Sequence, residues 1–366
     1  MQPAYIIAEA GVNHNGSEAH AMELIDIAAK AGADAIKFQL FKPELLVTAT
    51  AATAEYQARN LNDTRISQRQ MLEKLTLPEG ALVRLEAHCR EKHIDFLCTP
   101  FDHESLGYLV KNTKMRYLKL PSGEVANGPL LLAAARTGLP IILSTGMADM
   151  QEIGVALGIL YFGYTHKDGI PAALDQPTPD MLAYLRSKVT LLHCVSQYPA
   201  PREATNLRAM DSMRDMFGLP TGLSDHTEGV DVALMAVARG AFVIEKHFTY
   251  DKNADGPDHK ASLTPGELKA LVEANGKAAV SADEAVLGSP LKRCQPVEES
   301  TRDIARKSVV AAAAIAQGEI FSERNLTCKR PATGGVAPNY LWSLLGKNST
   351  RGYSVDDFID STELSR

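Results

Sequence analysis

The chain of 366 residues has 38 lysines and arginines against 44 aspartates and glutamates, a net charge of −6. Hydrophobic residues make up 45% and charged residues 22%, which is the composition of a globular protein with an ample core. The acidic balance argues against nucleic acid or an anionic membrane as a partner.

The sequence also indicates a compartment. No apolar stretch reaches the roughly 18 residues of a transmembrane helix, and the first residues, MQPAYIIAEAG, enter a strand-like run without the pattern of a signal peptide. The five cysteines are odd in number and show no C-x-x-C spacing. They indicate reduced thiols, so we expect a cytoplasmic protein without a disulfide framework or zinc ribbon.

Short apolar runs alternate with helical patterns along most of the chain. The helical segments, such as AHAMELIDIAAKAGA, have apolar residues three and four apart, and several end at a glycine. Eight such units over roughly 280 residues are the number and length of a (β/α)8 TIM barrel. A doubly wound open sheet is the rival, but no G-x-G-x-x-G follows the first strand. The expected strands are 4–11, 34–41, 95–100, 116–123, 140–146, 189–196, 221–227 and 242–249.

Two segments interrupt the alternation, and one boundary ends it. Residues 42–78 contain two short amphipathic patterns and are expected to lie over the barrel mouth, whereas the Gly- and Pro-rich residues 163–181 form an insertion before the sixth strand. We therefore expect a barrel domain over 1–288, a linker over 289–303 and a small C-terminal domain of short strands over 304–366.

Every expected strand has polar residues at its C-terminal end, where the chemistry of a TIM barrel gathers. Residues two apart, such as Lys37 and Gln39, share one face of a strand. Buried charges are costly unless they are paired or coordinated, so a ring of them predicts a site. The polar residues at the strand ends are Glu9, Asn13, His14, Lys37, Gln39, Thr99, Asp102, Lys119, Ser122, Glu124, Ser144, Thr145, His193, Ser196, Tyr198, Ser224, Asp225, His226, Glu245, Lys246 and His247.

Two kinds of chemistry are compatible with these residue types. His226 and His247 would end neighbouring strands at one level, where two imidazoles with carboxylates nearby suit a divalent ion such as Mn²⁺, or are hydrogen-bonded core residues. Lysines beside hydroxyls at loop–helix junctions make a phosphate pocket, or are ordinary salt-bridge partners. The lysines and hydroxyls in question are Lys37, Lys119, Thr99, Ser122, Ser144 and Ser224.

Nine motifs in order are recognisable: AEAGVNHNGS, IKFQ, CTPFD, KLPSGE, LSTGM, YPAP followed by NL, SDHT, EKHFT and GPDHKAS. Together they resemble the bacterial N-acetylneuraminate (sialic acid) synthase family, in its sialic or legionaminic acid branch. The likeness spans nearly the whole chain, because NLTCKRPATGG is similar to the family's C-terminal antifreeze-like (SAF, β-clip) domain. Ser196, Ala332 and residues 163–181 depart from the family pattern.

The resemblance implies a reaction, a metal and a role for each site residue. Phosphoenolpyruvate condenses with an N-acetylated amino sugar; Glu9 acts as acid–base or orients water, and Glu245 stabilises developing positive charge. His226 and His247 hold Mn²⁺, with Mg²⁺ and Co²⁺ as alternatives. In a homodimer the C-terminal domain covers the partner's barrel and delivers Arg330. The phosphoenolpyruvate ligands are Lys37, Thr99, Lys119, Ser122, Ser144 and Ser224, and the sugar ligands are Gln39, Glu124, Tyr198, Asp258 and Arg330.

Alternatives remain for the sugar substrate and for the type of reaction. We expect N-acetylmannosamine and the product N-acetylneuraminate; the alternative is an N,N'-diacetyllegionaminate synthase that uses the 6-deoxy-diacetamido sugar, 2,4-diacetamido-2,4,6-trideoxymannose. A Schiff-base aldolase on the same barrel would use a desolvated Lys246 or Lys119 as its nucleophile. A non-catalytic saccharide-binding protein is the third reading.

Overall fold

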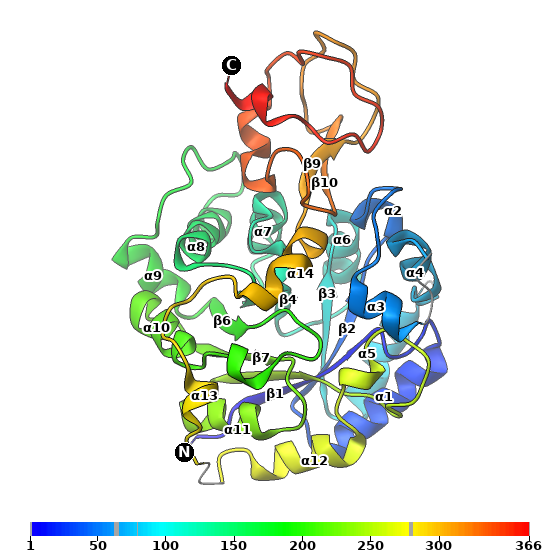
Figure 1. Cartoon of the computed structure of the whole chain (residues 1–366), viewed down its shortest axis with the longest axis vertical. Coiled ribbons are helices and arrows are strands. Elements are labelled where there is room, and N and C mark those ends of the chain that lie inside the picture. Colours follow the sequence, from blue (N-terminus) through cyan, green and yellow to red (C-terminus); the bar gives the residue numbers. More distant parts are fainter. Residues whose placement is uncertain (1, 62–65, 79, 278–280, 366) are drawn as a thin grey trace.

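The computed structural model of the chain describes residues 2–61, 66–78, 80–277 and 281–365. Its larger part is a ring of parallel strands enclosed by helices (Figure 1). The strands bond in the order β3-β2-β1-β8-β7-β6-β5-β4, and β3 contacts β4, so the sheet is nearly closed and the predicted TIM barrel is confirmed. The strands are β1 (Tyr5–Gly11), β2 (Ala35–Leu40), β3 (Asp95–Pro100), β4 (Leu118–Leu120), β5 (Ile141–Ser144), β6 (Val189–Cys194), β7 (Thr221–Asp225) and β8 (Val243–His247).

The helices that cover the barrel begin and end at residues suited to helix termini. The side chain of Ser17 accepts a hydrogen bond from the first turn of α1, and Gly32, with φ of 83°, ends it in the left-handed region. Asp149 and Glu152 form a reciprocal capping box at the start of α8. These helices are α1 (Glu18–Ala31), α5 (Ala81–Glu91), α6 (His103–Asn112), α7 (Gly128–Arg136), α8 (Met150–Thr165), α10 (Arg208–Phe217), α11 (Asp231–Ala238) and α12 (Pro265–Ala274).

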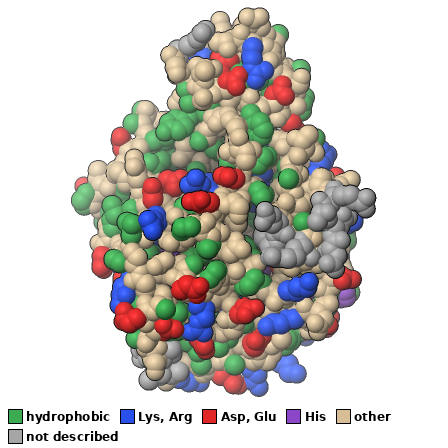
Figure 2. Space-filling view, viewed as in Figure 1, with side chains coloured by type: hydrophobic (Ala, Val, Ile, Leu, Met, Phe, Trp, Pro, Cys, Tyr) green, Lys and Arg blue, Asp and Glu red, His purple; other side chains and the backbone are tan. Residues whose placement is uncertain are grey.

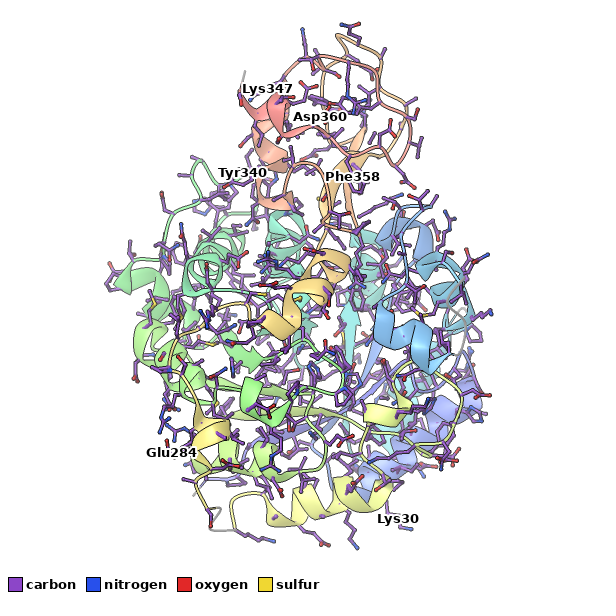
Figure 3. The ribbon with its side chains drawn as sticks, viewed as in Figure 1. Lys30, Glu284, Tyr340, Lys347, Phe358 and Asp360 are labelled. Carbon is purple, nitrogen blue, oxygen red and sulfur yellow. The ribbon has the colours of Figure 1, made fainter. Side chains whose placement is uncertain are left out.

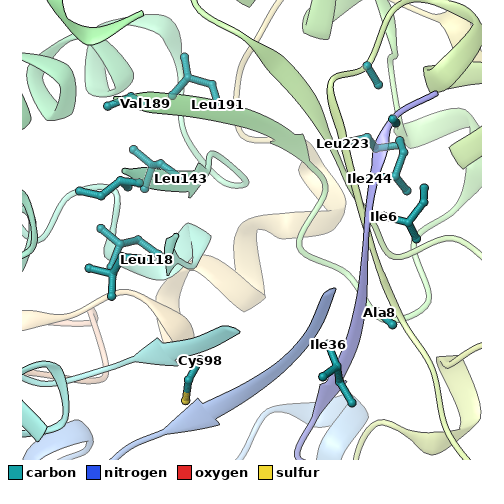
Figure 4. Packing of buried hydrophobic residues seen from close by; sticks show 14 of the residues in the cluster. Ile6, Ala8, Ile36, Cys98, Leu118, Leu143, Val189, Leu191, Leu223 and Ile244 are labelled. Carbon is teal, nitrogen blue, oxygen red and sulfur yellow. The ribbon is translucent and has the colours of Figure 1, made fainter. Parts of the chain in front are cut away.

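Alternate residues of each strand face opposite sides of the barrel wall. One set, which includes Ile6, Ile36 and Leu143, is buried in the large cluster between strands and helices (Figure 4). The other set fills the barrel interior with a separate apolar layer, made of Ile7, Ala35, Leu97, Ile142, Leu192 and Val243, with Tyr5 and Tyr117 against it. This layer closes the barrel below its C-terminal mouth.

The two interrupting segments have the predicted places. Within 42–78 lie α2 (Pro43–Leu46), α3 (Glu55–Asn60) and α4 (Gln68–Lys74), and an apolar cluster that includes Leu46, Met71 and Phe101 joins this segment to the barrel mouth. Residues 163–181 contain the end of α8, an irregular stretch and the start of α9 (Pro179–Leu185).

A small domain with its own core follows the barrel. It contains an antiparallel pair, β9 (Ser308–Ala311) and β10 (Leu326–Lys329), with η5 (Pro338–Ser343) and η6 (Ser361–Ser365). Its buried residues include Val309, Phe321 and Ile359. It stands on the barrel side that carries α6, α7 and α2 (Figure 1), where the Arg330 N–H donates to Leu46 O (2.9 Å).

Residues between the two parts pack on the barrel rather than leaving it. They form α13 (Glu284–Leu287), η4 (Pro296–Glu298) and α14 (Glu299–Ala305). Single turns η1 (Ser122–Glu124), η2 (Arg202–Ala204) and η3 (His259–Ala261) lie in the loops after β4, β6 and β8.

The surface has charges of both signs, which are interspersed over the face shown in Figure 2. Figure 3 places Tyr340 and Phe358 on the small domain, far from Lys30 and Glu284 at the other end of the barrel. In the described part of the chain, every helix is too short or too polar to cross a membrane.

Candidate active site

The site is built from one repeated step along the strands. Two residues beyond the apolar layer, each strand presents its next inward-facing residue to the cavity at the C-terminal mouth, as when Ile7 is followed by Glu9 and Val243 by Glu245. Because the apolar layer lies beneath, this second layer can be polar and still be enclosed. Its members are Glu9, Lys37, Thr99, Lys119, Ser144, Cys194, Ser224 and Glu245.

Two carboxylates and two lysines form the centre of this layer. Lys37 Nζ lies 2.6 Å from Glu9 Oε2 and 3.6 Å from Glu245 Oε2. Lys119 Nζ lies 3.3 Å from Glu245 Oε1. All four side chains are at most 7% exposed, so little water reaches them, and the opposite charges stabilise one another.

The surroundings move the pKa values of the two carboxyl groups in opposite directions. Burial raises the pKa of Glu9, although the charge of Lys37 opposes the shift. Burial also disfavours the charge on Glu245, but the charges of Lys119 and Lys37 outweigh it and lower the pKa of Glu245. Burial lowers the pKa of Lys119. Glu9 is therefore suited to hold and transfer a proton, and Glu245 to stay anionic.

The predicted hydroxyls lie around this centre. Lys37 Nζ donates to Thr99 Oγ1 (3.2 Å), and Ser224 Oγ donates to Glu245 Oε1 (2.8 Å). The N–H of Gly146 donates to Ser122 Oγ (2.9 Å). Within the described chain, the buried Ser144 Oγ has no hydrogen-bond partner, which leaves it for a bound molecule.

The two predicted metal ligands face one another across the ends of β7 and β8. The ring centroids of His226 and His247 are 5.6 Å apart, and His247 pairs in register with Glu9. The Nδ1–H of His226 donates to Val195 O (2.8 Å), which fixes that ring and leaves Nε2 for a ligand. Burial lowers the pKa of His247 well below its usual value, which favours the neutral imidazole that metal binding requires.

These two histidines fit a divalent ion with most positions open to water or substrate. Among the described residues, His, Cys, Asp and Glu form no cluster of three or more arranged around one ion. Burial disfavours the charge on His226, but the Cys194 sulfur 3.7 Å away, the Val195 carbonyl and Glu245 together raise its pKa. A bound cation would take the place of the proton on Nε2 of His226.

Four of the five predicted sugar ligands line the same cavity: Gln39, Tyr198, Asp258 and Arg330. Gln39 Nε2 donates to Glu9 Oε1 (3.2 Å). The Tyr198 ring packs on the His226 ring, with 4.1 Å between the ring centroids. Burial raises the pKa of Asp258 to about 6. The Arg330 guanidinium lies 5.2 Å from the Phe101 ring, in the cavity of its own chain.

The fifth, Glu124, does not line the cavity. It is fully buried, with Oε1 3.1 Å from Lys307 Nζ and Oε2 accepting from Asn127 Nδ2 (2.6 Å). It joins the end of β4 to the start of the small domain. A contact of Glu124 with the sugar stays a prediction.

Some ionisable residues at the strand ends face away from the site. Lys246 Nζ donates to Asp225 Oδ2 (2.7 Å) and Thr227 O (2.6 Å) outside the cavity. His193 Nε2 donates to Thr205 O (2.6 Å), and burial lowers its pKa to about 3. Their places follow from strand alternation, because both lie one residue from an inward-facing position.

The sequence did not identify a second wall of the cavity. Beside apolar residues of α2 and α4, it has two glutamines, Gln57 and Gln68, whose Oε1 atoms are buried and, in the described chain, without a hydrogen-bond partner. Gln68 lies three and four residues before Met71 and Leu72. A polar residue on the apolar face of a predicted helix was the signal that could have found it.

Comparison with known proteins identifies the family. The sequence model of the NeuB family matches residues 24–286, and that of the SAF domain matches residues 306–351. The chain belongs to the NeuB family. It is an enzyme, and the family and the C-terminal SAF domain predicted from its motifs are confirmed.

The similarity to known proteins extends over almost the full chain. An N,N'-diacetyllegionaminic acid synthase of Campylobacter jejuni is 45% identical over 98% of this chain and 99% of its own length. One of Legionella pneumophila is 40% identical over 96% of this chain and 92% of its own. The crystal structure of the spore coat polysaccharide biosynthesis protein SpsE of Bacillus subtilis superposes with a TM-score of 0.80, at 32% identity, covering 99% of this chain and 95% of that one.

Proposed function

We propose that this NeuB-family enzyme condenses phosphoenolpyruvate with an N-acetylated amino sugar and water, giving a nonulosonic acid and phosphate. The observation that carries the proposal is the buried group of Glu9, Lys37, Lys119 and Glu245 on one polar layer. It offers two cations for an anionic substrate beside two carboxyl groups whose pKa values are shifted in opposite directions. Synthase names among the full-length relatives support the same reaction.

Phosphoenolpyruvate suits the lysine side of this layer. Its phosphate and carboxylate would accept hydrogen bonds from Lys37 and Lys119, with Ser144 offering an unused hydroxyl. Thr99, Ser122 and Ser224 are already oriented by the lysine, the Gly146 N–H and Glu245. The anion would thus enter an arranged set of donors and would not have to organise them.

The two carboxyl groups have distinct tasks in the reaction. As C3 of the enol attacks the open-chain aldehyde, Glu9 gives its proton to the aldehyde oxygen, which becomes a hydroxyl. The anionic Glu245 stabilises positive charge developing at C2. Glu9, now a carboxylate, takes a proton from the water that adds to C2. The C2–O bond to phosphate then breaks, the new C2 hydroxyl becomes the carbonyl of the 2-keto acid, and its proton leaves with the phosphate.

His226 and His247 would hold the divalent ion of the site, for which we propose Mn²⁺. When bound, such an ion polarises an oxygen of the substrate as a Lewis acid. The fixed His226 ring and the neutral His247 keep two ligands on one side of the cavity.

The sugar would occupy the rest of the cavity, against Gln39, Tyr198, Asp258 and Arg330. N-acetylmannosamine and 2,4-diacetamido-2,4,6-trideoxymannose are the two candidates. The proposed homodimer would place Arg330 of each chain in the other barrel, whereas in the single chain it lines its own.

Phosphate release from phosphoenolpyruvate, measured with each sugar in turn, tests the proposal. We expect release that requires a sugar and stops in Lys37→Met, with a nonulosonic acid identified by mass spectrometry. If neither sugar supports release above the rate without sugar, the proposed reaction is wrong.

A further inference from the structure

The cavity of the NeuB-family site has a second region with a chemistry unlike that of its floor. Segment 42–78 contributes Leu46, Met71, Leu72 and Leu75 to its lining, next to residues from the ends of β1, β2 and β3. Together they form an apolar wall across the mouth, composed of Val12, Phe41, Leu46, Met71, Leu72, Leu75 and Phe101. A wall of this kind suits methyl groups, and its apolar side chains offer no hydrogen-bond partner to a hydroxyl.

Gln68 is a polar residue on this wall. It begins α4, its backbone N–H donates to Ala51 O (3.1 Å), and only 3% of the residue is exposed. Its Oε1 is buried and, in the part of the chain that the structure describes, accepts no hydrogen bond. Folding alone gives no reason for an unpaired amide oxygen here, because burying one costs free energy. A ligand that donates to Oε1 would remove that cost.

The neighbouring helix brings a second amide to the same place. The Oε1 of Gln57 on α3 is also buried and, among the described residues, without a partner. Asn60 of the same helix donates to Pro257 O (2.6 Å), which ties α3 to the loop that carries Asp258. The amide-bearing wall therefore lies over the region in which the sugar is proposed to bind.

An acetamido group matches this combination better than a hydroxyl does. Its N–H can donate to Gln68 Oε1, while its methyl group packs against Met71, Leu72 and Leu75. Of the two candidate sugars, N-acetylmannosamine has one acetamido group, at C2, and hydroxyls at C4 and C6. The trideoxy sugar has a second acetamido group at C4 and a methyl at C6. Only the latter supplies an additional amide and a second apolar end.

We propose that Gln68 is a specificity-determining residue, which accepts a hydrogen bond from the C4 acetamido group of 2,4-diacetamido-2,4,6-trideoxymannose. This inference rests on the proposed condensation with phosphoenolpyruvate. It adds that the apolar wall of segment 42–78 selects the diacetamido sugar over N-acetylmannosamine.

The test is a cycle of two enzymes and two sugars. Wild type and Gln68→Met, which removes the acceptor at nearly constant volume, are compared by kcat/KM for the diacetamido sugar and for N-acetylmannosamine. We expect wild type to prefer the diacetamido sugar, and Gln68→Met to reduce that preference about tenfold, the effect of one hydrogen bond left unmade. Lys74→Met, an exposed position on the same helix, should keep the wild-type ratio.

A measurement on wild type alone covers the case in which Gln68→Met does not fold. The sugar 2-acetamido-2,6-dideoxymannose keeps the C6 methyl but has a hydroxyl at C4, so its kcat/KM should fall about tenfold below that of the diacetamido sugar. A wild type that prefers N-acetylmannosamine, or a folded Gln68→Met with an unchanged ratio, overturns the inference while the proposed reaction stands. Absence of turnover with every sugar refutes the proposed reaction itself.

Discussion

Removing the carboxyl group of Glu298 should detach the segment that joins the two domains. This side chain is fully buried and accepts three backbone hydrogen bonds, from Met147 N–H (2.9 Å) and Ser196 N–H (2.7 Å) at Oε1 and from Gln295 N–H (2.8 Å) at Oε2. It thereby ties η4 to the chain just after β5 and β6, at the edge of the cavity.

The size of the effect follows from the number of donors. Each hydrogen bond to a carboxylate contributes about 1.5–3 kcal/mol, and water can reach part of the released segment, so Glu298→Ala should lower the free energy of unfolding by about 4–5 kcal/mol. Glu298→Gln keeps an oxygen for Met147 and Ser196 but turns an amide N–H₂ toward the Gln295 N–H. We expect it to lose about 2 kcal/mol.

Urea unfolding and limited proteolysis measure the two consequences. In Glu298→Ala, cleavage within 289–305 should become faster than cleavage elsewhere, and the sugar KM should rise because Arg330 follows this segment. The adjacent and exposed Glu299→Ala should change stability by less than about 0.5 kcal/mol. A Glu298→Ala protein within about 1 kcal/mol of wild type, with an unchanged cleavage pattern, would refute this reasoning.

Four further predictions concern the metal, the bond that breaks, the small domain and pH. Chelation should abolish phosphate release, Mn²⁺ should restore it, and His226→Ala or His247→Ala should lose bound manganese in metal analysis; normal turnover after complete chelation would make both histidines structural. In heavy-oxygen water, mass spectrometry should find label at C2 of the nonulosonic acid, whereas label in the phosphate would mean attack at phosphorus. Arg330→Ala should raise the sugar KM far more than the phosphoenolpyruvate KM. If the subunits exchange their small domains, mixing Arg330→Ala chains with Glu9→Gln chains should restore activity. The exchange is ruled out if light scattering verifies a dimer and the mixture is no more active than its parents. Because burial raises the pKa of Asp258 from 3.8 to about 6, the native state binds this proton more tightly than the unfolded chain, so its contribution to stability is greatest below pH 3.8 and is lost as pH rises through about 6. Asp258→Asn should flatten that part of the plot of urea midpoint against pH, and equal slopes would contradict the assignment.

The barrel and its polar layer were predictable because both follow from alternation along short strands. Once Ile7 or Val243 is assigned to the interior, Glu9 or Glu245 must follow it two residues later on the same face. The strand bounds were less predictable. The expected strand 116–123 is reduced to Leu118–Leu120, because Pro121 has no N–H for the ladder and η1 begins directly after it.

Contacts between segments far apart in the chain could not be predicted in this way. Glu298 lies in the expected linker, where nothing local shows that its partners follow β5 and β6. Glu124 belongs to the KLPSGE motif, but its carboxylate is engaged by Lys307, almost two hundred residues later, at 3.1 Å. Such pairings depend on how the linker and the small domain pack on the barrel, which periodicity does not encode.

The charges that end β8 show why position on a strand, and not charge alone, separates chemistry from structure. Glu245 faces the cavity, where two lysines balance it, whereas Lys246 faces outward and is 2% exposed, bound to Asp225 and Thr227. A Schiff-base nucleophile must reach the substrate as a neutral amine, and Lys246 has neither access nor freedom from its carboxylate partner. Lys119 has access and a pKa lowered by burial, yet Glu245 lies 3.3 Å away and favours its cation. The arrangement therefore fits two lysines that bind an anion better than one lysine that attacks a carbonyl.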